Sequence, residues 1–356
     1  MECTLDLSRT YAIALEGGGA KGGYEIGVWK ALDEAGVRYN AVSGTSVGAL
    51  NGALMVMRDL KRAIDAWSNI RMSKVIDLGD MDEADAKKLM EGELDFEDWQ
   101  QLIPQALELI RNRGLDVSPL RAWVREIIDA KRVRESDVDF YICTVSLSDR
   151  KVLELHVKEL PEEEICDMLL ASAYHPSFRL EKLGGKYYAD GGFADNLPIH
   201  ALVEAGYRDI IAVHIPAMGV ERRFKLPEDA RITDIRTWAE LGHVLNFDAE
   251  QARRDMDIGY LDAKRVLYGL HGRRYYFERT MSEREALDWI LDRLSGTAES
   301  MRAFLEQELP NTAARLDAAD CDYYELMLRL AEEEAEKQGI EPLRVYTDRE
   351  LLDKLE

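Results

Sequence analysis

Short apolar runs alternate with helix-like stretches through the first part of the chain, and this alternation limits the possible folds more than any other feature. YAIAL (11–15) precedes EIGVWKALDEAG (25–36), and YNAVSG (39–44) precedes VGALNGALMVMRDLKRAIDAW (47–67). Such alternation is typical of βα units, whose strands lie parallel in one sheet. The sequence therefore predicts an α/β fold with a mainly parallel central sheet.

The sheet is expected to resume after a long helical insertion at about residues 58–135, which carries acidic stretches. The insertion is either a set of surface helices packed on the sheet or a lid over a binding cleft. Later strand candidates are DFYICTVSL (139–147), KVLELHV (151–157), DIIAVHI (209–215) and RRYYFER (273–279). We expect a main domain over 8–216, its continuation over 217–280, and a helical C-terminal region over 281–356.

The charge balance limits the partners of this chain. It has 68 acidic against 46 basic residues, a formal net charge of -22. That charge opposes nonspecific attraction to nucleic acid or to an anionic membrane. We expect no nucleic-acid partner, and membrane contact only as a transient one through a local patch. The oligomeric state stays open.

The cysteines and the N-terminus give expectations about compartment. The cysteines (Cys3, Cys143, Cys166 and Cys321) form no C-x-x-C pair, and no histidine lies at zinc-ligand spacing, so neither disulfides nor a metal site is expected. The N-terminus lacks the basic region of a signal peptide, and no apolar run is long enough to span a membrane. A cytoplasmic protein is the expectation, with secretion without a cleaved signal left open.

EGGGAKGG (16–23) follows the first strand and has the G-x-G-x-x-G spacing of a dinucleotide-binding turn. That motif also needs an acidic residue at the end of the second strand, and YNAVSG carries none. The G-K-[ST] ending of a P-loop is missing as well. No nucleotide cofactor is therefore expected, and the loop needs another explanation.

GTSVG (44–48) follows the second strand and matches G-x-S-x-G. In this motif the serine lies on a sharp turn between a strand and a helix, and the flanking glycines, here Gly44 and Gly48, let the neighbouring chain pass closely. The pattern makes Ser46 a candidate nucleophile at the carboxyl end of the sheet. The glycine loop would lie beside it, with its backbone N–H groups turned toward a developing oxyanion.

A serine nucleophile needs a base, and two candidates remain open. Asp190, followed by Gly191 and Gly192, reads as an exposed carboxylate on a tight turn, and a direct hydrogen bond to Ser46 would make a Ser-Asp dyad. Alternatively, Asp190 and His214 would complete a triad in the chain order of α/β-hydrolases.

EGGGAKGG, GTSVG and ADGGFADNLP, in this order, resemble the patatin-like phospholipase family. LLASAYHPSF, before the third motif, is similar to the family's A-S-x-x-x-P-x-F segment. The resemblance implies a three-layer sandwich in which Ser46 is the nucleophile, Asp190 its base, and no cofactor is used. It implies that the oxyanion loop comprises Gly17, Gly18, Gly19, Lys21 and Gly22, with the N–H groups of Gly18 and Gly19 as donors.

Two positions depart from the family pattern. Lys21 stands where Arg is common, although Lys lacks the bidentate geometry of Arg, and His175 stands where many relatives have a small or apolar residue. The function that the resemblance implies is hydrolysis of lipid acyl esters, as by a phospholipase, lysophospholipase or carboxylesterase. The alternatives are an acyltransferase with the same acyl-enzyme chemistry and a non-catalytic scaffold whose C-terminal third binds a partner.

Overall fold

The computed structural model describes residues 2–79, 82–85, 88, 114–294 and 301–355. They form two compact units: Leu5–Ala263, and Lys264–Glu356 together with Met1–Thr4. The domain limits after residues 216 and 280 remain predictions from the sequence, and the structure divides its units between Ala263 and Lys264.

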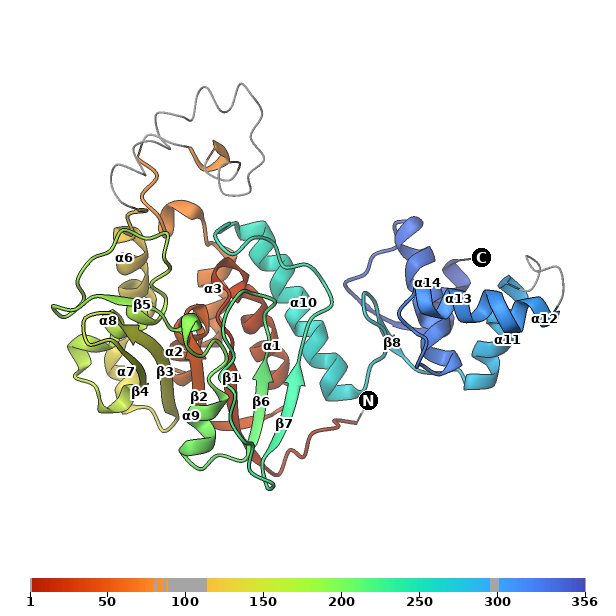
Figure 1. Cartoon of the computed structure of the whole chain (residues 1–356), viewed down its shortest axis with the longest axis horizontal. Coiled ribbons are helices and arrows are strands. Elements are labelled where there is room, and N and C mark those ends of the chain that lie inside the picture. The colour runs from red at the N-terminus through yellow and green to blue at the C-terminus, as the bar shows by residue number, and fades with distance from the viewer. Residues whose placement is uncertain (1, 80–81, 86–87, 89–113, 295–300, 356) are drawn as a thin grey trace. The chain divides into compact units, whose positions relative to one another are not determined.

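A mainly parallel sheet forms the centre of the larger unit, as the sequence predicts (Figure 1). Its order is β4-β3-β2-β1-β6-β7, and β5 pairs with β3. β4 and β5 run antiparallel to β3, and the other pairs are parallel. The strands are β1 (Thr10–Leu15), β2 (Arg38–Thr45), β3 (Asp139–Ser146), β4 (Lys151–His156), β5 (Tyr188–Asp190), β6 (Asp209–Val213) and β7 (Arg231–Ile235).

Helices cover both faces of this sheet (Figure 1). The α-helices of the unit are α1 (Gly23–Glu34), α2 (Val47–Val56), α3 (Leu60–Ser68), α6 (Ser118–Ile127), α7 (Ala130–Glu135), α8 (Glu162–Ser172), α9 (Ile199–Glu204) and α10 (Ala249–Tyr268), which continues into the smaller unit. The short 3-10 turns are η1 (Gly19–Gly22), η2 (Met72–Lys74), η3 (Val157–Glu159) and η4 (Gly191–Phe193).

The alternation of side chains along the strands assigns each helix to a face. Ala12, Ala14 and Ala41 form one buried cluster with Leu202 and Val203 of α9. On the opposite face, α2 packs closely on β2 and β3, where a Cβ at Gly52 would lie 2.7 Å from Phe140. Apolar side chains are therefore buried on both faces, which makes the larger unit a three-layer sandwich.

Three sequence expectations need correction. The stretch 47–67 is two helices, because Arg58 has φ 53° and the Asp59 carboxylate accepts the N–H of Arg62 at 3.2 Å to begin α3. β7 was missed because its two apolar residues, Ile232 and Ile235, do not alternate with a period of two and only Ile235 is buried. β5 was missed because it is a three-residue strand formed only through its pairing with β3.

The described parts of the predicted insertion, 58–135, are helical in α3, α6 and α7. Residues 80–81, 86–87 and 89–113 of this insertion, which hold most of its acidic stretch, lie outside the described residues.

The smaller unit has its own apolar core around Phe277, Phe304 and Met327. Its elements are β8 (Tyr276–Glu278), α11 (Glu283–Leu294), α12 (Met301–Ala303), the π-helical η6 (Phe304–Glu308), α13 (Leu309–Arg315), α14 (Tyr323–Lys337), β9 (Val345–Thr347) and α15 (Asp348–Lys354). β8 and β9 pair in parallel. The predicted strand 273–279 and C-terminal helices are therefore present, and they belong to an independent core.

Candidate active site

Ser46 lies on the sharp turn between β2 and α2, with φ 56° and ψ -123°. Few non-glycine residues adopt a positive φ, and such strain is typical of functional turns. The turn is possible because α2 begins against the end of β1: a Cβ at Gly48 would lie 2.6 Å from the carbonyl oxygen of Leu15. A Cβ at Gly44 would lie 2.2 Å from the carbonyl oxygen of Gly48. Both elbow glycines predicted from the sequence are thus required by close backbone contacts.

The register of β3 brings Asp190 to this turn. Thr45, the last residue of β2, pairs with Cys143, and Asp190 pairs with the next residue of β3, Thr144. β5 therefore occupies the edge of β3 just beyond the point where β2 ends. Ser46 and Asp190, which are 144 residues apart in the sequence, become neighbours because β2 and β5 pair with the same edge of β3.

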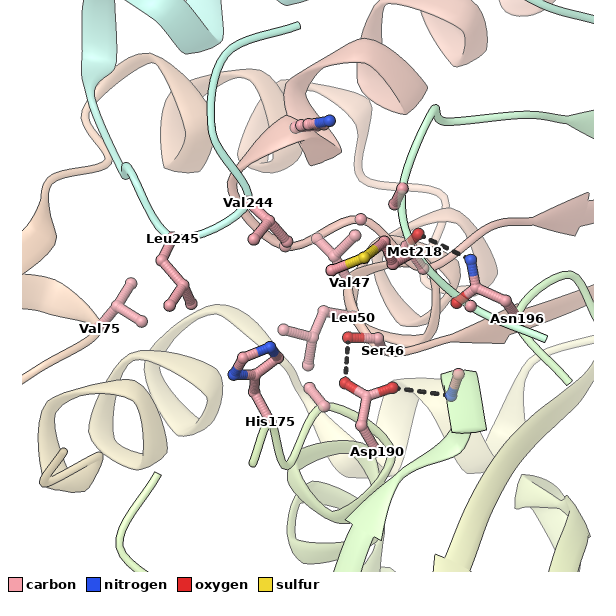
Figure 2. Close-up of a pocket in the computed structure, with 18 of the residues that line it drawn as sticks. Ser46, Val47, Leu50, Val75, His175, Asp190, Asn196, Met218, Val244 and Leu245 are labelled. Atoms are coloured by element: carbon pink, nitrogen blue, oxygen red, sulfur yellow. Dashed lines mark hydrogen bonds between the residues drawn. The ribbon is translucent and has the colours of Figure 1, made fainter. Parts of the chain in front are cut away.

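Ser46 and Asp190 are directly hydrogen bonded. The Ser46 hydroxyl donates to Asp190 Oδ2 at 2.7 Å, and the Gly192 N–H donates to Asp190 Oδ1 at 2.8 Å (Figure 2). Burial raises the pKa of Asp190 from 3.8 to about 6, although both hydrogen bonds act to lower it. Gly191 begins η4, so Asp190 lies at the start of a turn, as the D-G-G pattern indicates; the predicted exposure of its carboxylate is wrong, because Asp190 is buried.

The glycine loop, η1 with the residues before it, lies beside Ser46. Gly17, Gly18 and Gly19 all border the same cavity as Ser46. The Gly17 N–H is already used, because it donates to the Asn196 carbonyl at 3.0 Å. Among the described residues, the N–H groups of Gly18 and Gly19 donate to no protein atom. Gly19 has φ +59°. The loop thus leaves two adjacent donors available to a ligand.

The other two predicted loop residues have different environments. Lys21 borders the cavity and donates from Nζ to the Pro216 carbonyl at 2.5 Å, which links the glycine loop to the segment after β6. Burial lowers the pKa of Lys21. Gly22 packs against Val47 and Trp67, and its carbonyl accepts from Asn51 Nδ2 at 2.9 Å. Gly22 therefore helps to seat the loop on α2 and α3.

Two buried residues that the sequence interpretation did not use hold the loops together. Asn196 Nδ2 donates to Glu16 Oε1 and to the Gly17 carbonyl, both at 3.1 Å. Glu16 Oε2 accepts the N–H of Ile215 at 2.7 Å. Burial raises the pKa of Glu16 to about 7. No pattern within the D-N-L-P segment indicates this role, because the partners of the Asn196 side chain lie 180 and 179 residues away in the sequence.

Ser172 supports the strained elbow from α8. Its hydroxyl accepts the N–H of Ser46 at 3.0 Å and donates to the Cys143 carbonyl at 2.7 Å. Ser172 is fully buried. The serine of LLASAYHPSF therefore fixes the backbone of the candidate nucleophile to β3, a function that no pattern within one segment reveals.

A cavity of about 970 Å³ opens next to Ser46 and Asp190. Its walls are mainly apolar, and it is large for a small-molecule pocket. Figure 2 shows Ser46 and Asp190 beside Asn196 and Met218, with Val75, Val244 and Leu245 extending away on the other side. The apolar lining includes Val47, Leu50, Val75, Phe178, Val244 and Leu245.

The described part of the predicted insertion contributes a wall of this cavity. Trp67 of α3 and Trp123 of α6 both line it, with ring centroids 6.3 Å apart in an edge-to-face contact. Leu120 of α6 lines it as well. The insertion thus supplies apolar surface to the candidate site.

The two histidines considered from the sequence lie in different places. His214 Nε2 is 2.7 Å from Asp234 Oδ1, and its Nδ1 is 4.0 Å from Glu16 Oε2, so its polar contacts are with neither Ser46 nor Asp190. His175 lines the cavity, and its Nδ1 lies 2.8 Å from Ser177 Oγ. The structure brings together Ser46 and Asp190 and leaves His214 outside the cavity lining.

One cluster among the described residues has the composition of a metal site. Ligand atoms of Glu154, His200 and Glu204 lie within 4.8 Å of one another. Existing ion pairs account for this cluster, because His200 Nε2 is 3.1 Å from Glu204 and the Arg222 guanidinium contacts Glu154. These residues do not line the cavity of Ser46.

The sequence of this chain matches the model of the family "Patatin-like phospholipase" over residues 13–203, which contain the glycine loop, Ser46 and Asp190. The chain belongs to the patatin-like phospholipase family. The family match thus covers the sheet from β1 to β5 and ends within α9.

Relatives of the family include much longer proteins. "Patatin-like phospholipase domain-containing protein 6" of Homo sapiens is 23% identical over 212 residues, 58% of this chain and 13% of that protein. "Lysophospholipase nte1" of Aspergillus terreus is 52% identical over 46 residues, 13% of this chain and 3% of that protein. The chain therefore spans a small part of the length of these relatives.

A solved structure, VipD from Legionella pneumophila, is similar with a TM-score of 0.39 and 15% identity, over 97% of this chain and 79% of that one. Among the described residues of the present chain, no helix is both long and apolar enough to cross a bilayer.

Proposed function

We propose that this chain hydrolyses acyl esters of lipids through a Ser46–Asp190 dyad. The observation that carries the proposal is the 2.7 Å hydrogen bond between Ser46 Oγ and Asp190 Oδ2, at the edge of a large apolar cavity. Phospholipids, lysophospholipids and simple carboxyl esters share the reacting group and an apolar chain. Membership of a phospholipase family, and similarity to a protein named a lysophospholipase, support this substrate class.

In the first half-reaction, Asp190 accepts the Ser46 proton while Ser46 Oγ attacks the ester carbonyl carbon. The N–H groups of Gly18 and Gly19 stabilise the oxyanion that forms, and the N-terminus of α2 adds its positive dipole. Protonated Asp190 then gives its proton to the departing alkoxide, which leaves an acyl-Ser46 ester. A pKa near 6 suits both roles, because the carboxylate is charged at neutral pH and is still basic enough to accept a proton.

In the second half-reaction, Asp190 removes a proton from water as the water attacks the acyl-Ser46 carbonyl. Collapse of this intermediate releases the fatty acid, and Asp190 returns the proton to Ser46 Oγ. An alcohol in place of water would give acyl transfer instead, so addition of acceptor alcohols followed by product analysis separates hydrolase from acyltransferase.

The test is hydrolysis of a short-chain chromogenic ester together with labelling by a fluorophosphonate. We expect Ser46→Ala to abolish both reactions, and Asp190→Asn to reduce turnover by at least about 10³-fold, as for other nucleophile–base pairs. His214→Ala is the matched control, because a triad would lose comparable activity and a dyad would not. Undiminished turnover in Asp190→Asn, or collapse in His214→Ala, contradicts the dyad. A wild-type protein that resists the probe and cleaves no ester supports the scaffold alternative.

A further inference from the structure

The mouth of the active-site cavity carries apolar side chains that point into solvent. Phe193 on η4 is 58% exposed, Met218 is 100% exposed and Val220 is 52% exposed. All three also line the cavity that contains Ser46. They form what we call the apolar rim (Phe193, Met218 and Val220). Isolated exposed apolar residues need no explanation, but a group of them at one cavity mouth does.

The apolar rim is held outward by a fixed backbone. The Val220 N–H donates to the Gly192 carbonyl at 2.9 Å, and the Val220 carbonyl accepts the N–H of Asn196 at 2.7 Å. At the other end of this segment, Lys21 holds the Pro216 carbonyl at 2.5 Å. The segment is therefore tied at both ends to the loops that carry the candidate catalytic groups. Exposure of the apolar Met218 side chain to water has an unfavourable free energy. Because the backbone of this segment is anchored at both ends, the segment does not fold back to bury Met218.

Basic residues follow the apolar rim in the sequence, after the acidic Glu221. The segment 221–225, ERRFK, has three basic residues against one acidic residue, in a chain whose net charge is -22. Arg222 is paired with Glu154, whereas exposed Arg223 and Lys225 make no ion pair with another described residue. A local positive charge beside exposed apolar groups is the combination that binds an anionic lipid interface.

We propose that the apolar rim inserts into an anionic lipid surface, with Arg223 and Lys225 at the head groups, so that the cavity opens directly onto the membrane. This inference rests on the proposed lipid hydrolysis for its biological meaning, but the binding itself does not require catalysis. Contact through the rim would let an acyl chain pass from lipid to the apolar cavity without crossing water. The acidity of the remaining chain keeps the contact confined to this face.

The binding test uses the full chain with Ser46→Ala, so that no lipid is consumed. Co-sedimentation with vesicles of phosphatidylcholine and phosphatidylglycerol is compared for this protein and for added Phe193→Asp and Met218→Asp. Loss of one large apolar side chain from the interface should weaken binding about tenfold per substitution. Arg223→Glu with Lys225→Glu should weaken binding to the anionic vesicles and leave the weaker binding to pure phosphatidylcholine unchanged.

A matched pair of variants separates the rim from general surface effects. Val152 on β4 is 51% exposed, nearly the same as Val220, but it does not line the cavity. Val220→Asp should reduce vesicle binding, and Val152→Asp should not. Equal binding by all of these variants, or equal losses at Val220 and Val152, overturns the proposal. Absence of vesicle binding by the Ser46→Ala protein with an unaltered apolar rim also overturns the proposal, and would indicate that the rim binds a protein partner instead.

Activity distinguishes failure of this inference from failure of the proposed function. With active Ser46, rim substitutions should lower the ratio of vesicle-substrate to soluble-ester turnover about tenfold. An unchanged ratio contradicts membrane docking while leaving hydrolysis intact. Rim-dependent vesicle binding by a protein that cleaves no ester refutes the hydrolase function and upholds the docking.

Discussion

Replacement of Asp190 by Asn is expected to stabilise the fold while it removes the candidate base. Burial raises the pKa of Asp190 from 3.8 to about 6, so the folded chain holds this proton more tightly than the unfolded chain does. Such a group favours unfolding as the pH rises through the interval between the two values. Below pH 3.8, Asp190 is protonated in both the folded and the unfolded state. Above pH 6, Asp190 is charged in both states, and the full free-energy cost of burying that charge destabilises the folded state.

The size of the effect follows from the shift. A pKa shift of about two units corresponds to a free-energy cost of folding of about 3 kcal/mol at pH 8 and about half of that at pH 5. Asn carries no charge, and its Oδ1 can still accept the N–H of Gly192. Its Nδ2 would donate to Ser46 Oγ, which reverses the present hydrogen bond in which the Ser46 hydroxyl donates to Asp190. We therefore expect Asp190→Asn to gain up to about 3 kcal/mol of unfolding free energy at pH 8 and about half of that at pH 5.

The assay is urea unfolding of wild type and variant at both pH values, with the difference between proteins taken at each pH so that other titrating groups cancel. Asp149→Asn is the control. Hydrogen bonds from Lys186 and Ser146 lower the pKa of Asp149, so its negative charge does not destabilise the folded state. The control should show no gain. A destabilised Asp190→Asn at pH 8, or a difference that does not change with pH, would refute the reasoning.

Three further outcomes are expected. The kcat/KM for a soluble ester should fall about tenfold per pH unit below pH 6, because Asp190 is then protonated, and a flat profile from pH 5 to pH 8 would contradict its role as base. Gly44→Ala should give little folded protein on circular dichroism, since its Cβ would lie 2.2 Å from a backbone oxygen, whereas Gly36→Asn, with open space and φ +74°, should fold normally. Ser172→Ala should lower kcat about tenfold with KM nearly unchanged, because it frees the N–H of Ser46; an effect on KM alone would argue against this support.

The sequence predicted the local parts of the site well, because each depends on a short-range steric rule. G-x-S-x-G indicates the elbow since only small neighbours permit the backbone contacts that Gly44 and Gly48 make. The βα alternation likewise predicted the parallel sheet. These features are encoded within about ten residues of one another, and the pattern is sufficient to find them.

The sequence did not reveal the contacts that join distant segments. Glu16, Asn196 and Ser172 hold the loops through hydrogen bonds to residues far away in the chain, and each looks unremarkable within its own segment. β5 forms only because β3 offers an edge beyond the end of β2. The resemblance of the three ordered motifs to the family favoured Asp190 over His214, whereas the contact of Asp190 with Ser46 and that of His214 with Asp234 are properties of the tertiary structure.

The shared edge of β3 has a consequence for how such a chain can change. Thr45, the residue before Ser46, pairs with Cys143 of β3, and Asp190 pairs with the next residue of the same strand, Thr144. The distance between Ser46 and Asp190 is therefore set by the spacing of two successive residues of β3. It does not depend on the number of residues between α2 and β3, or between β4 and β5. Insertions there can reshape the wall of the cavity, and hence the molecules admitted to it, without disturbing the distance between the reacting groups.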